Sequence, residues 1–380
     1  MNILVTGAKG FIGKNLTAQL YNIMKGKAQA PTLPSGMKLF EYDLDTEPAL
    51  FDDYCKKADF VFHLAGVNRP REQEKFMEGN FGFTSVLLDT LKKCGNACPV
   101  LLASSIQAET DNLYGQSKKA GEELLFSYGA ETGARILVYR FPNVFGKWCK
   151  PNYNSVVATF CHNIARGLPV TVNDRDAELT LAYIDDLVDE LLRALSGEET
   201  RAGRYCTVPN IHQVTLGRLT DLLYSFEACR EERGVPDLSD AFVQKLYATY
   251  QSYLPSDRFG YPLTMNRDAR GSFTELFRTA ERGQYSINIT KPGIVKGNHW
   301  HNTKHEKFVV VSGRGIIRLR RMDDDEVVSY VVSGDRIEAV DIPPGYTHTI
   351  ENVGETDLVT FMWCSECFDT EHPDTYYLEV

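Results

Sequence analysis

Tyr114 and Lys118 stand four residues apart in a segment with helical spacing of apolar residues, and such a pair can transfer a proton. Side chains at this separation project from one face of a helix. The ammonium group then lowers the pKa of the phenol by attraction to the phenolate. A phenol tuned in this way can exchange a proton with an alcohol or a ketone. Ser105, with Ser104 as the alternative, follows the preceding strand and can hold the same oxygen.

A glycine-rich loop lies near the start of the chain. Gly7, Gly10 and Gly13 form a GxxGxxG pattern directly after a predicted strand and before a predicted helix. The glycines allow a tight turn, and the helix N-terminus offers N–H groups to a pyrophosphate. With the Tyr-Lys pair, this loop predicts a nicotinamide dinucleotide and hydride transfer. The predicted cofactor-binding residues are Gly7, Lys9, Gly10, Phe11, Ile12, Gly13, Leu64, Ala65, Tyr114 and Lys118.

The residues themselves leave the choice between NADPH and NADH open. Asp43, at the end of the second predicted strand, can hydrogen-bond a ribose hydroxyl and repel a 2′-phosphate, which favours NADH. Lys9, inside the glycine loop, can instead meet a 2′-phosphate. Asp43 can also simply start a turn, and Lys9 can be a solvated side chain.

A second group of chemically capable residues lies in the last third of the chain. His299, His301 and Glu306 share one short segment, and His348 follows a Pro-rich turn. Two histidines at alternate positions of a strand face one side, and we expect Glu306 and His348 to come from neighbouring strands. Three imidazoles and one carboxylate suit Zn²⁺ or another divalent transition metal. We interpret His305 as a residue that faces water, with a ligand or base role as the alternatives.

Hydrophobic periodicity predicts the elements that must position these residues. In the first half, short β-branched runs alternate with helical patterns, which indicates a parallel sheet with crossover helices. The predicted strands are 3–6, 39–42, 59–64, 100–103 and 135–139, and the predicted helices are 14–24, 81–93 and 117–128. From 154 to about 250 the pattern is mainly helical and indicates a smaller lobe over the carboxyl edge of the sheet, where such folds bind ligands.

The pattern changes completely after a stretch of aromatic and turn residues around 250–262. Short alternating strands then follow, separated by Gly, Pro and Asp turns, as is typical of a small all-β barrel or jelly roll. The predicted strands are 284–289, 307–311, 315–320, 327–332, 335–341 and 358–363. We therefore predict a first domain over 1–250, with a substrate lobe over about 150–250, a linker over 251–264 and a second domain over 265–380.

Composition disfavours several kinds of partner. The 380 residues carry a net charge of −10 without a basic cluster, which disfavours nucleic acid. No apolar run reaches the length of about eighteen residues that indicates a membrane span, and no signal-peptide pattern precedes the first strand. Nine scattered cysteines argue for reduced thiols, and we interpret the CxxC pair Cys364 and Cys367 as packing residues. We expect a cytoplasmic protein.

Residues 1–245 resemble the extended short-chain dehydrogenase/reductase family of nucleotide-sugar enzymes. The resemblance rests on the glycine loop, the Tyr-Lys pair, and the segments 140–146 and 183–186. It implies an α/β Rossmann fold and a catalytic triad of Ser105, Tyr114 and Lys118, although the stretch between Ser105 and Tyr114 is shorter than is usual in the family. Family dehydratases carry an acidic pair where this chain has Ile106 and Gln107, so we expect ketone reduction or epimerisation rather than loss of water.

Residues 265–380 resemble cupins, and also the cupin-like dTDP-4-dehydrorhamnose 3,5-epimerases through the segments 268–275 and 291–299. The second resemblance implies a site for a 4-keto sugar nucleotide. Epimerisation at carbon 3 needs a base and an electrophile that holds the enolate, and Lys296 and the metal are the candidates for the electrophile. The two resemblances assign His299 differently, as a ligand or as the base, and we favour the ligand role. The substrate-binding candidates over the whole chain are Asn143, Arg175 and Lys291.

Taken together, the chain resembles two-domain enzymes of capsular polysaccharide synthesis, through the segments 145–153, 297–301 and 374–380. This resemblance implies that the cupin inverts carbon 3 of UDP-2-acetamido-2,6-dideoxy-β-L-arabino-4-hexulose. The first domain then reduces carbon 4 with NADPH to UDP-N-acetyl-6-deoxy-L-talosamine, toward N-acetyl-L-fucosamine. It also implies a homodimer that pairs through the cupins.

Two other functions stay open. One is a single-activity nucleotide-sugar reductase or 4-epimerase with a structural or dimerising cupin. The other is a redox-sensing binding protein on a degenerate dehydrogenase fold, and the intact Ser105, Tyr114 and Lys118 argue against it.

Overall fold

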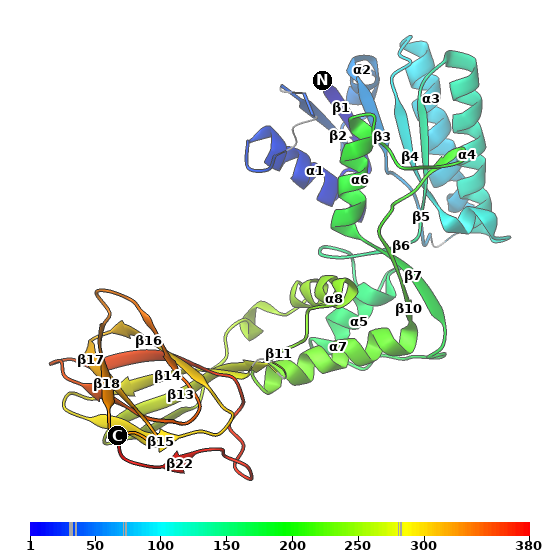
Figure 1. The fold of residues 1–380 in the computed structure, drawn as a ribbon. Helices are drawn as coiled ribbons and strands as arrows, with labels where there is room; N and C mark the ends of the chain where they lie inside the picture. Colours follow the sequence, from blue (N-terminus) through cyan, green and yellow to red (C-terminus); the bar gives the residue numbers. More distant parts are fainter. Residues whose placement is uncertain (30–32, 35, 71, 73, 280, 282) are drawn as a thin grey trace. The chain divides into compact units, whose positions relative to one another are not determined.

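The fold is that of a computed structural model, which describes residues 1–29, 33–34, 36–70, 72, 74–279, 281 and 283–380. The chain divides into two compact units (Figure 1). The first unit holds Met1–Leu223 and Ala241–Pro255, and the second holds Tyr224–Asp240 and Ser256–Val380. Within the described part of the chain, no helix is long and apolar enough to cross a membrane.

A parallel sheet forms the centre of the first unit, as the sequence predicts. Its strands follow the order β2-β1-β3-β4-β5-β9-β8, and the first six pair in parallel. The strands are β1 (Asn2–Thr6), β2 (Lys38–Tyr42), β3 (Phe60–His63), β4 (Val100–Ser105), β5 (Ile136–Phe141), β8 (Arg201–Ala202) and β9 (Tyr205–Cys206). The chain runs from β1 outward to β2 and then returns past β1 to β3. This reversal creates a switch point at the carboxyl ends of β1 and β3, where open α/β sheets bind ligands.

Helices cover both faces of this sheet (Figure 1). One face packs against α1 (Phe11–Met24) and α6 (Ile184–Leu195). The other packs against α2 (Leu50–Lys57), α3 (Phe83–Lys93) and α4 (Leu113–Thr132). Two short helices join these elements, a π-helical turn η1 (Met77–Gly82) and a 3₁₀ turn η2 (Ile106–Glu109). The predicted helices correspond to α1, α3 and α4, whereas α2 was not expected.

A smaller sheet with several helices follows β5. A three-stranded sheet of order β10-β7-β6 packs with several helices. These elements are β6 (Asn143–Phe145), α5 (Val156–Ile164), β7 (Glu178–Tyr183), β10 (Ile211–Thr215), α7 (Leu216–Glu231) and α8 (Ala241–Gln251). The segment Tyr224–Asp240 lies within the predicted first domain, 1–250, but belongs to the second unit. The reason is that β11 (Gly234–Val235) pairs with β13 (Gly271–Thr279) of that unit.

The second unit consists of two antiparallel sheets, in agreement with the predicted all-β barrel. One sheet has the order β11-β13-β14-β21-β16-β19, with β12 beside β13, and the other has the order β18-β17-β20-β15-β22. The remaining elements are η3 (Ser256–Arg258), β12 (Met265–Asp268), β14 (Gly283–Thr290), β15 (Val295–Trp300), β16 (Glu306–Ser312), β17 (Arg314–Arg321), β18 (Val327–Ser333), β19 (Ala339–Ile342), β20 (Tyr346–Asn352), β21 (Leu358–Cys364) and β22 (Tyr376–Tyr377). Apolar side chains from both sheets form one core, which includes Phe308, Ile317 and Ile350.

Two sequence predictions about this unit were incomplete. The predicted strand 335–341 is wrong over its first half, because Ser333 and Arg336 form a tight bridge and the strand β19 begins only at Ala339. The strands β15 and β20, which carry His299 and His348, were not among the predicted strands. Both contain polar residues that face a cavity, so neither shows a regular apolar alternation.

Candidate active sites and metal centre

The glycine loop lies at the switch point of the parallel sheet. Gly7 has a left-handed φ of 71°, and a Cβ atom there would lie 2.7 Å from the backbone nitrogen of Ala65. A Cβ atom at Gly13 would lie 2.1 Å from the Gly7 carbonyl oxygen. Only glycine therefore lets the loop after β1 contact the loop after β3 and the start of α1. No side chain caps α1 at Gly10, which leaves this helix N-terminus able to receive an anion.

The two residues that bear on the choice of cofactor lie together beside this loop. The backbone N–H of Lys9 donates to Asp43 Oδ2 at 2.7 Å, and the Lys9 ammonium group pairs with Asp45. The hydrogen bond that Lys9 donates to Asp45 raises the pKa of Lys9, so this lysine is charged. The arrangement thus combines a cation and two carboxylates at the position where Rossmann folds contact the adenosine ribose.

Tyr114 and Lys118 face the same side of α4. The Lys118 Nζ atom lies 5.8 Å from the centroid of the Tyr114 ring and donates to the Ala103 carbonyl oxygen at 3.0 Å. Burial lowers the pKa of Lys118 to about 8. Burial also raises the pKa of Tyr114, and a hydrogen bond with Ser105 offsets only part of that rise. The expected lowering of the phenol pKa is therefore wrong for this state, because desolvation of the phenolate outweighs the other effects.

The geometry distinguishes between the two serines at the end of β4. Ser104 is buried and its hydroxyl donates to Glu122, which in turn binds Arg140. Ser105, by contrast, interacts with Tyr114 and accepts a hydrogen bond from the Gln107 N–H at 3.2 Å. Of the two hydroxyls, that of Ser105 is the one directed to the phenol.

The short connection between β4 and α4 is regularly structured and still joins Ser105 to the helix that carries Tyr114. The turn η2 fills it, and Asn112 caps α4 by accepting a hydrogen bond from Gly115 N at 2.8 Å. A Cβ atom at Gly115 would lie 2.1 Å from the Gln107 carbonyl oxygen, so the turn and the helix are in direct contact. Glu109 of the turn pairs with Arg140. The reduced length therefore does not prevent Ser105 and Tyr114 from meeting.

Asn80 is a buried residue of this site that the sequence did not single out. Its amide nitrogen donates to Ser117 Oγ and to the Val67 carbonyl, both at 3.0 Å. A Cβ atom at Gly66 would lie 2.9 Å from both Asn80 Oδ1 and Lys118 Nζ, so the two side chains border one small space. Asn80 belongs to the π-helical turn η1, and such turns often occur at functional sites but have no sequence signature.

The four candidate ligands of the second unit form one cluster. One ligand atom each from His299, His301, Glu306 and His348 lie within 4.8 Å of one another. Glu306 Oε2 lies 3.2 Å from His348 Nε2 and 3.5 Å from His301 Nε2. All three of these atoms are buried and have no hydrogen-bond partner. Buried polar atoms without partners are costly, and a divalent transition metal would satisfy them, so the donor set fits Zn²⁺.

Backbone distortion explains the position of His299 on β15, and His301 follows directly after the end of that strand. Gly297 has a φ of 108° and the pairing of β15 with β20 is bulged between Gly297 and His299. The bulge sets His299 opposite His348, and burial lowers the pKa of His299 to about 4, which keeps it neutral as a ligand must be. Glu306 was expected on a neighbouring strand, but it begins β16 in the other sheet. The cluster therefore joins the two sheets.

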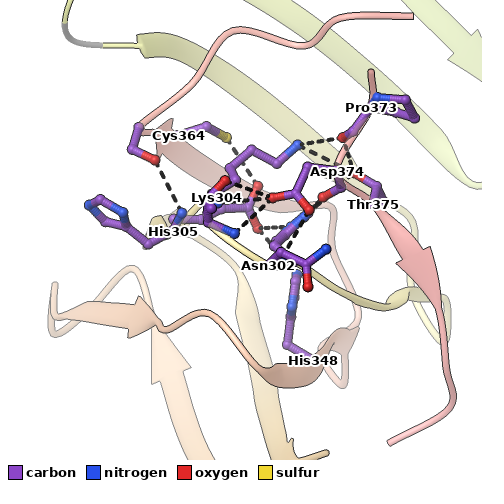
Figure 2. A network of polar contacts seen from close by, with 12 residues as sticks. Asn302, Lys304, His305, His348, Cys364, Pro373, Asp374 and Thr375 are labelled. Carbon is purple, nitrogen blue, oxygen red and sulfur yellow. Dashed lines mark hydrogen bonds and ion pairs between the residues drawn. The ribbon is translucent and has the colours of Figure 1, made fainter. Parts of the chain in front are cut away.

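Further polar groups hold the cluster in place (Figure 2). Cys364 lies opposite Glu306 in the sheet and its thiol donates to Glu306 Oε1 at 3.0 Å. The backbone carbonyl of Asp374 accepts a hydrogen bond from His301 Nδ1. Cys364 thus contacts a candidate ligand, which the interpretation of the CxxC pair as packing residues did not anticipate.

A cavity of about 1100 Å³ opens beside the cluster. Lys296 lines it together with His299, and its ammonium group donates to Asn288 Oδ1 at 2.7 Å and to the Ile289 carbonyl at 2.9 Å. Burial lowers the pKa of Lys296. The cavity can therefore bring a substrate ketone within reach of a lysine and of the cluster.

All three substrate-binding candidates are exposed. Lys291 pairs with Asp357 at 2.9 Å and is not among the described residues that line the cavity. Arg175 is exposed and pairs with Asp221 at 2.6 Å. Asn143 is exposed at the start of β6. His305, which we expected to face water, is exposed with its ring against Trp363.

A Rossmann unit with a Ser-Tyr-Lys site, joined to a cupin barrel, defines a two-domain dehydrogenase-type protein. A family model described as "NAD dependent epimerase/dehydratase family" matches residues 3–205, and one described as "Polysaccharide biosynthesis C-terminal domain" matches residues 266–376. The chain belongs to the NAD dependent epimerase/dehydratase family.

Three relatives illustrate the similarity. UDP-2-acetamido-2,6-beta-L-arabino-hexul-4-ose reductase of Pseudomonas aeruginosa is 40% identical over 380 residues, which covers 100% of this chain and 99% of the relative. The capsular polysaccharide assembling protein CapF from Staphylococcus aureus is 53% identical, with a TM-score of 0.92 and full coverage of both chains. RMD from Pseudomonas aeruginosa, solved with NADPH, is 26% identical with a TM-score of 0.50, over 60% of this chain and 82% of that chain. The expected resemblance to two-domain capsule enzymes is confirmed.

Proposed function

We propose that this protein converts a UDP-linked 4-keto-6-deoxy-N-acetylhexosamine in two steps. The cupin epimerises carbon 3 of UDP-2-acetamido-2,6-dideoxy-β-L-arabino-4-hexulose, and the first unit reduces carbon 4 to UDP-N-acetyl-6-deoxy-L-talosamine, toward N-acetyl-L-fucosamine for capsular polysaccharide. The observation that carries the proposal is that one chain holds two sites suited to a ketone. One is Tyr114 with Lys118, and the other is Lys296 beside the His-Glu cluster. The full-length similarity to a hexulose reductase supports the substrate class.

In the reduction, the chain positions the ketone and supplies the proton. Ser105 donates a hydrogen bond to the C4 oxygen, and the Tyr114 phenol gives that oxygen its proton. Lys118, anchored by its hydrogen bond to the Ala103 carbonyl, offers positive charge that stabilises the resulting phenolate. Bound NADPH supplies the hydride. The structure of RMD with NADPH and the charged Lys9 support the choice of NADPH over NADH.

In the epimerisation, the chain stabilises an enolate. The proton at carbon 3 is acidic only while the neighbouring C4 ketone is present, so this step must precede the reduction. The Lys296 ammonium group is the candidate donor to the enolate oxygen. His299, His301, Glu306 and His348 would hold Zn²⁺ or another divalent transition metal, which supplies Lewis acidity when bound.

We also propose a homodimer that forms through the cupin domains. The strand β18 lies at the edge of its sheet and exposes Val327, Val328, Tyr330 and Val331. Exposed apolar edge strands tend to pair with another chain. This exposed edge supports the proposed homodimer.

The alternative is a single-activity reductase with a structural cupin, and the name of the Pseudomonas relative, which mentions only a reductase, favours it. Incubation of the 4-keto substrate in heavy water without NADPH distinguishes the two functions. Deuterium at carbon 3, followed by NMR identification of the talosamine product once NADPH is added, is the expected result. If NADPH is consumed without any deuterium uptake, the cupin has no epimerase activity.

A further inference from the structure

Asp374 lies against the loop that separates two members of the cluster (Figure 2). This loop runs from His301, the first residue after β15, to Glu306 at the start of β16. The Asp374 carboxylate accepts hydrogen bonds from three consecutive backbone N–H groups of the loop, each at 3.0 Å: those of Asn302, Thr303 and Lys304. Three N–H groups that donate to one carboxylate fix the path of the loop. They therefore also fix the separation of His301 and Glu306 at its two ends.

Asp374 also contacts His301 directly. The backbone carbonyl of Asp374 bonds to His301 Nδ1. A carbonyl oxygen can only accept, so Nδ1 must carry the proton and Nε2 must carry the lone pair. His301 Nε2 lies 3.5 Å from Glu306 Oε2 and has no hydrogen-bond partner. The contact thus selects the tautomer that can bind a metal through Nε2.

The segment around Asp374 is itself tied to the strands that carry the other histidines. The short strand β22 pairs with β15, with Tyr377 opposite His299. Thr347, beside His348 on β20, donates its hydroxyl to the Leu378 carbonyl. Asp374 has a left-handed φ of 35°, an unfavourable conformation for a residue with a side chain that persists only where surrounding contacts enforce it.

We propose that Asp374 is a positioning residue that orients His301 for metal binding, through its carbonyl on Nδ1 and its carboxylate on the 302–304 loop. The inference rests on the metal site of the proposed function. Groups that hold a ligand histidine in this way typically change metal affinity by about 10- to 100-fold when they are removed. Asp374 touches no reacting atom and acts only through His301 and the 302–304 loop.

Zn²⁺ affinity tests this role directly. The full chain, stripped of metal, is titrated with Zn²⁺ in competition with a chromophoric chelator, and Asp374→Ala is compared with the wild type. We expect Asp374→Ala to bind Zn²⁺ about 10- to 100-fold more weakly. Asp369→Ala is the matched control, because the Asp369 carboxylate belongs to the same segment but accepts its hydrogen bond from the Glu371 N–H. This variant should bind Zn²⁺ like the wild type. Equal affinity of Asp374→Ala and the wild type would overturn the proposal.

Failure of the metal site itself gives a different result. If the wild type and His348→Ala both fail to bind Zn²⁺, the proposed metal site is wrong and the role of Asp374 falls with it. If the wild type binds Zn²⁺ and His348→Ala does not, the site stands, and the comparison with Asp374→Ala then decides the role of Asp374 alone.

Imidazole NMR provides a readout that loss of folding cannot imitate. In the metal-free wild type, the His301 ring, assigned with His301→Gln, should show the tautomer protonated at Nδ1. A ring protonated at Nε2 would refute the proposal. Should Asp374→Ala fail to fold, Asp374→Asn keeps one acceptor oxygen and the backbone carbonyl, and its Zn²⁺ affinity should fall between those of the wild type and His301→Gln. A folded Asp374→Asn variant that has lost its hydrogen bonds to the 302–304 loop but binds Zn²⁺ as tightly as the wild type would also contradict the positioning role of Asp374.

Discussion

Lys118 donates a hydrogen bond from Nζ to the backbone carbonyl of Ala103, 3.0 Å away at the end of β4. This bond ties the face of α4 that carries the Tyr-Lys pair to the strand that ends in the serines. The ammonium group is thereby held 5.8 Å from the centre of the Tyr114 ring, although the four methylene groups of a lysine would otherwise leave it free to move. The proton-transfer pair is fixed by a backbone atom rather than by a charged partner.

Tyr114→Phe should abolish reduction and spare epimerisation. The phenol is the proposed proton donor to the C4 oxygen, and loss of a general acid costs about 10²- to 10⁴-fold in rate. The measurements are NADPH oxidation, followed by the loss of NADPH absorbance, and deuterium uptake at carbon 3 in the absence of NADPH. Loss of both activities in a folded variant would contradict two independent sites.

Reduction should decline as the pH rises above about 8. Lys118 is protonated below that pH and neutral above it, because burial has lowered its pKa to about 8. Loss of this charge removes the stabilisation of the Tyr114 phenolate. The measurement is the pH profile of kcat/KM for NADPH oxidation, with NADPH affinity followed over the same range as the control. A profile that keeps its plateau to about pH 10, near the ordinary pKa of lysine, would rule out this role of the charge.

Gly13→Ala should weaken NADPH binding. The new Cβ atom would lie 2.1 Å from the Gly7 carbonyl oxygen, so the glycine loop must shift away from α1. Overpacking of this kind costs about 1–3 kcal/mol, which corresponds to roughly a 10- to 100-fold increase in Kd if it falls on the bound loop. Fluorescence titration with NADPH measures the change. Gly82→Ala is the matched control, since its Cβ atom would approach no atom closer than 3.8 Å.

His348→Ala should empty the metal site, and His305→Ala should not. His348 Nε2 is buried 3.2 Å from Glu306 Oε2, whereas His305 is exposed and its ring lies against Trp363. Elemental analysis of the purified variants measures the bound metal, and deuterium uptake at carbon 3 measures the cupin step. Full metal occupancy of His348→Ala would remove His348 from the set of ligands.

Much of the fold could be predicted because it depends on short-range pattern. The apolar runs of β1, β3 and β5 identify buried parallel strands, and Gly7 and Gly13 identify a loop that no larger residue could form. The change to short alternating strands identifies the second fold in the same way. These features are encoded locally, because periodicity reports which face of an element is buried.

Three predictions failed where local pattern met a competing effect. The phenol of Tyr114 has a raised pKa because burial is a tertiary quantity that the Tyr-Lys spacing does not contain. The strand 335–341 is shortened by the bridge between Ser333 and Arg336. Glu306 reaches the cluster from the other sheet, and the way the sheets pair cannot be derived from the spacing of the ligands.

The amino-acid sequence by itself determined the two fold classes, the glycine loop and the residue types at each candidate site. Only the tertiary structure decided which other residues contact and position these site residues. Asn80 meets Ser117 across 37 positions and borders Lys118, and the Asp374 carbonyl meets His301 across 73 positions. Such contacts have no period and no motif, because they arise when separately encoded elements pack against one another. The roles of Asn80 and Asp374 can therefore be inferred only from the folded structure, where these contacts exist.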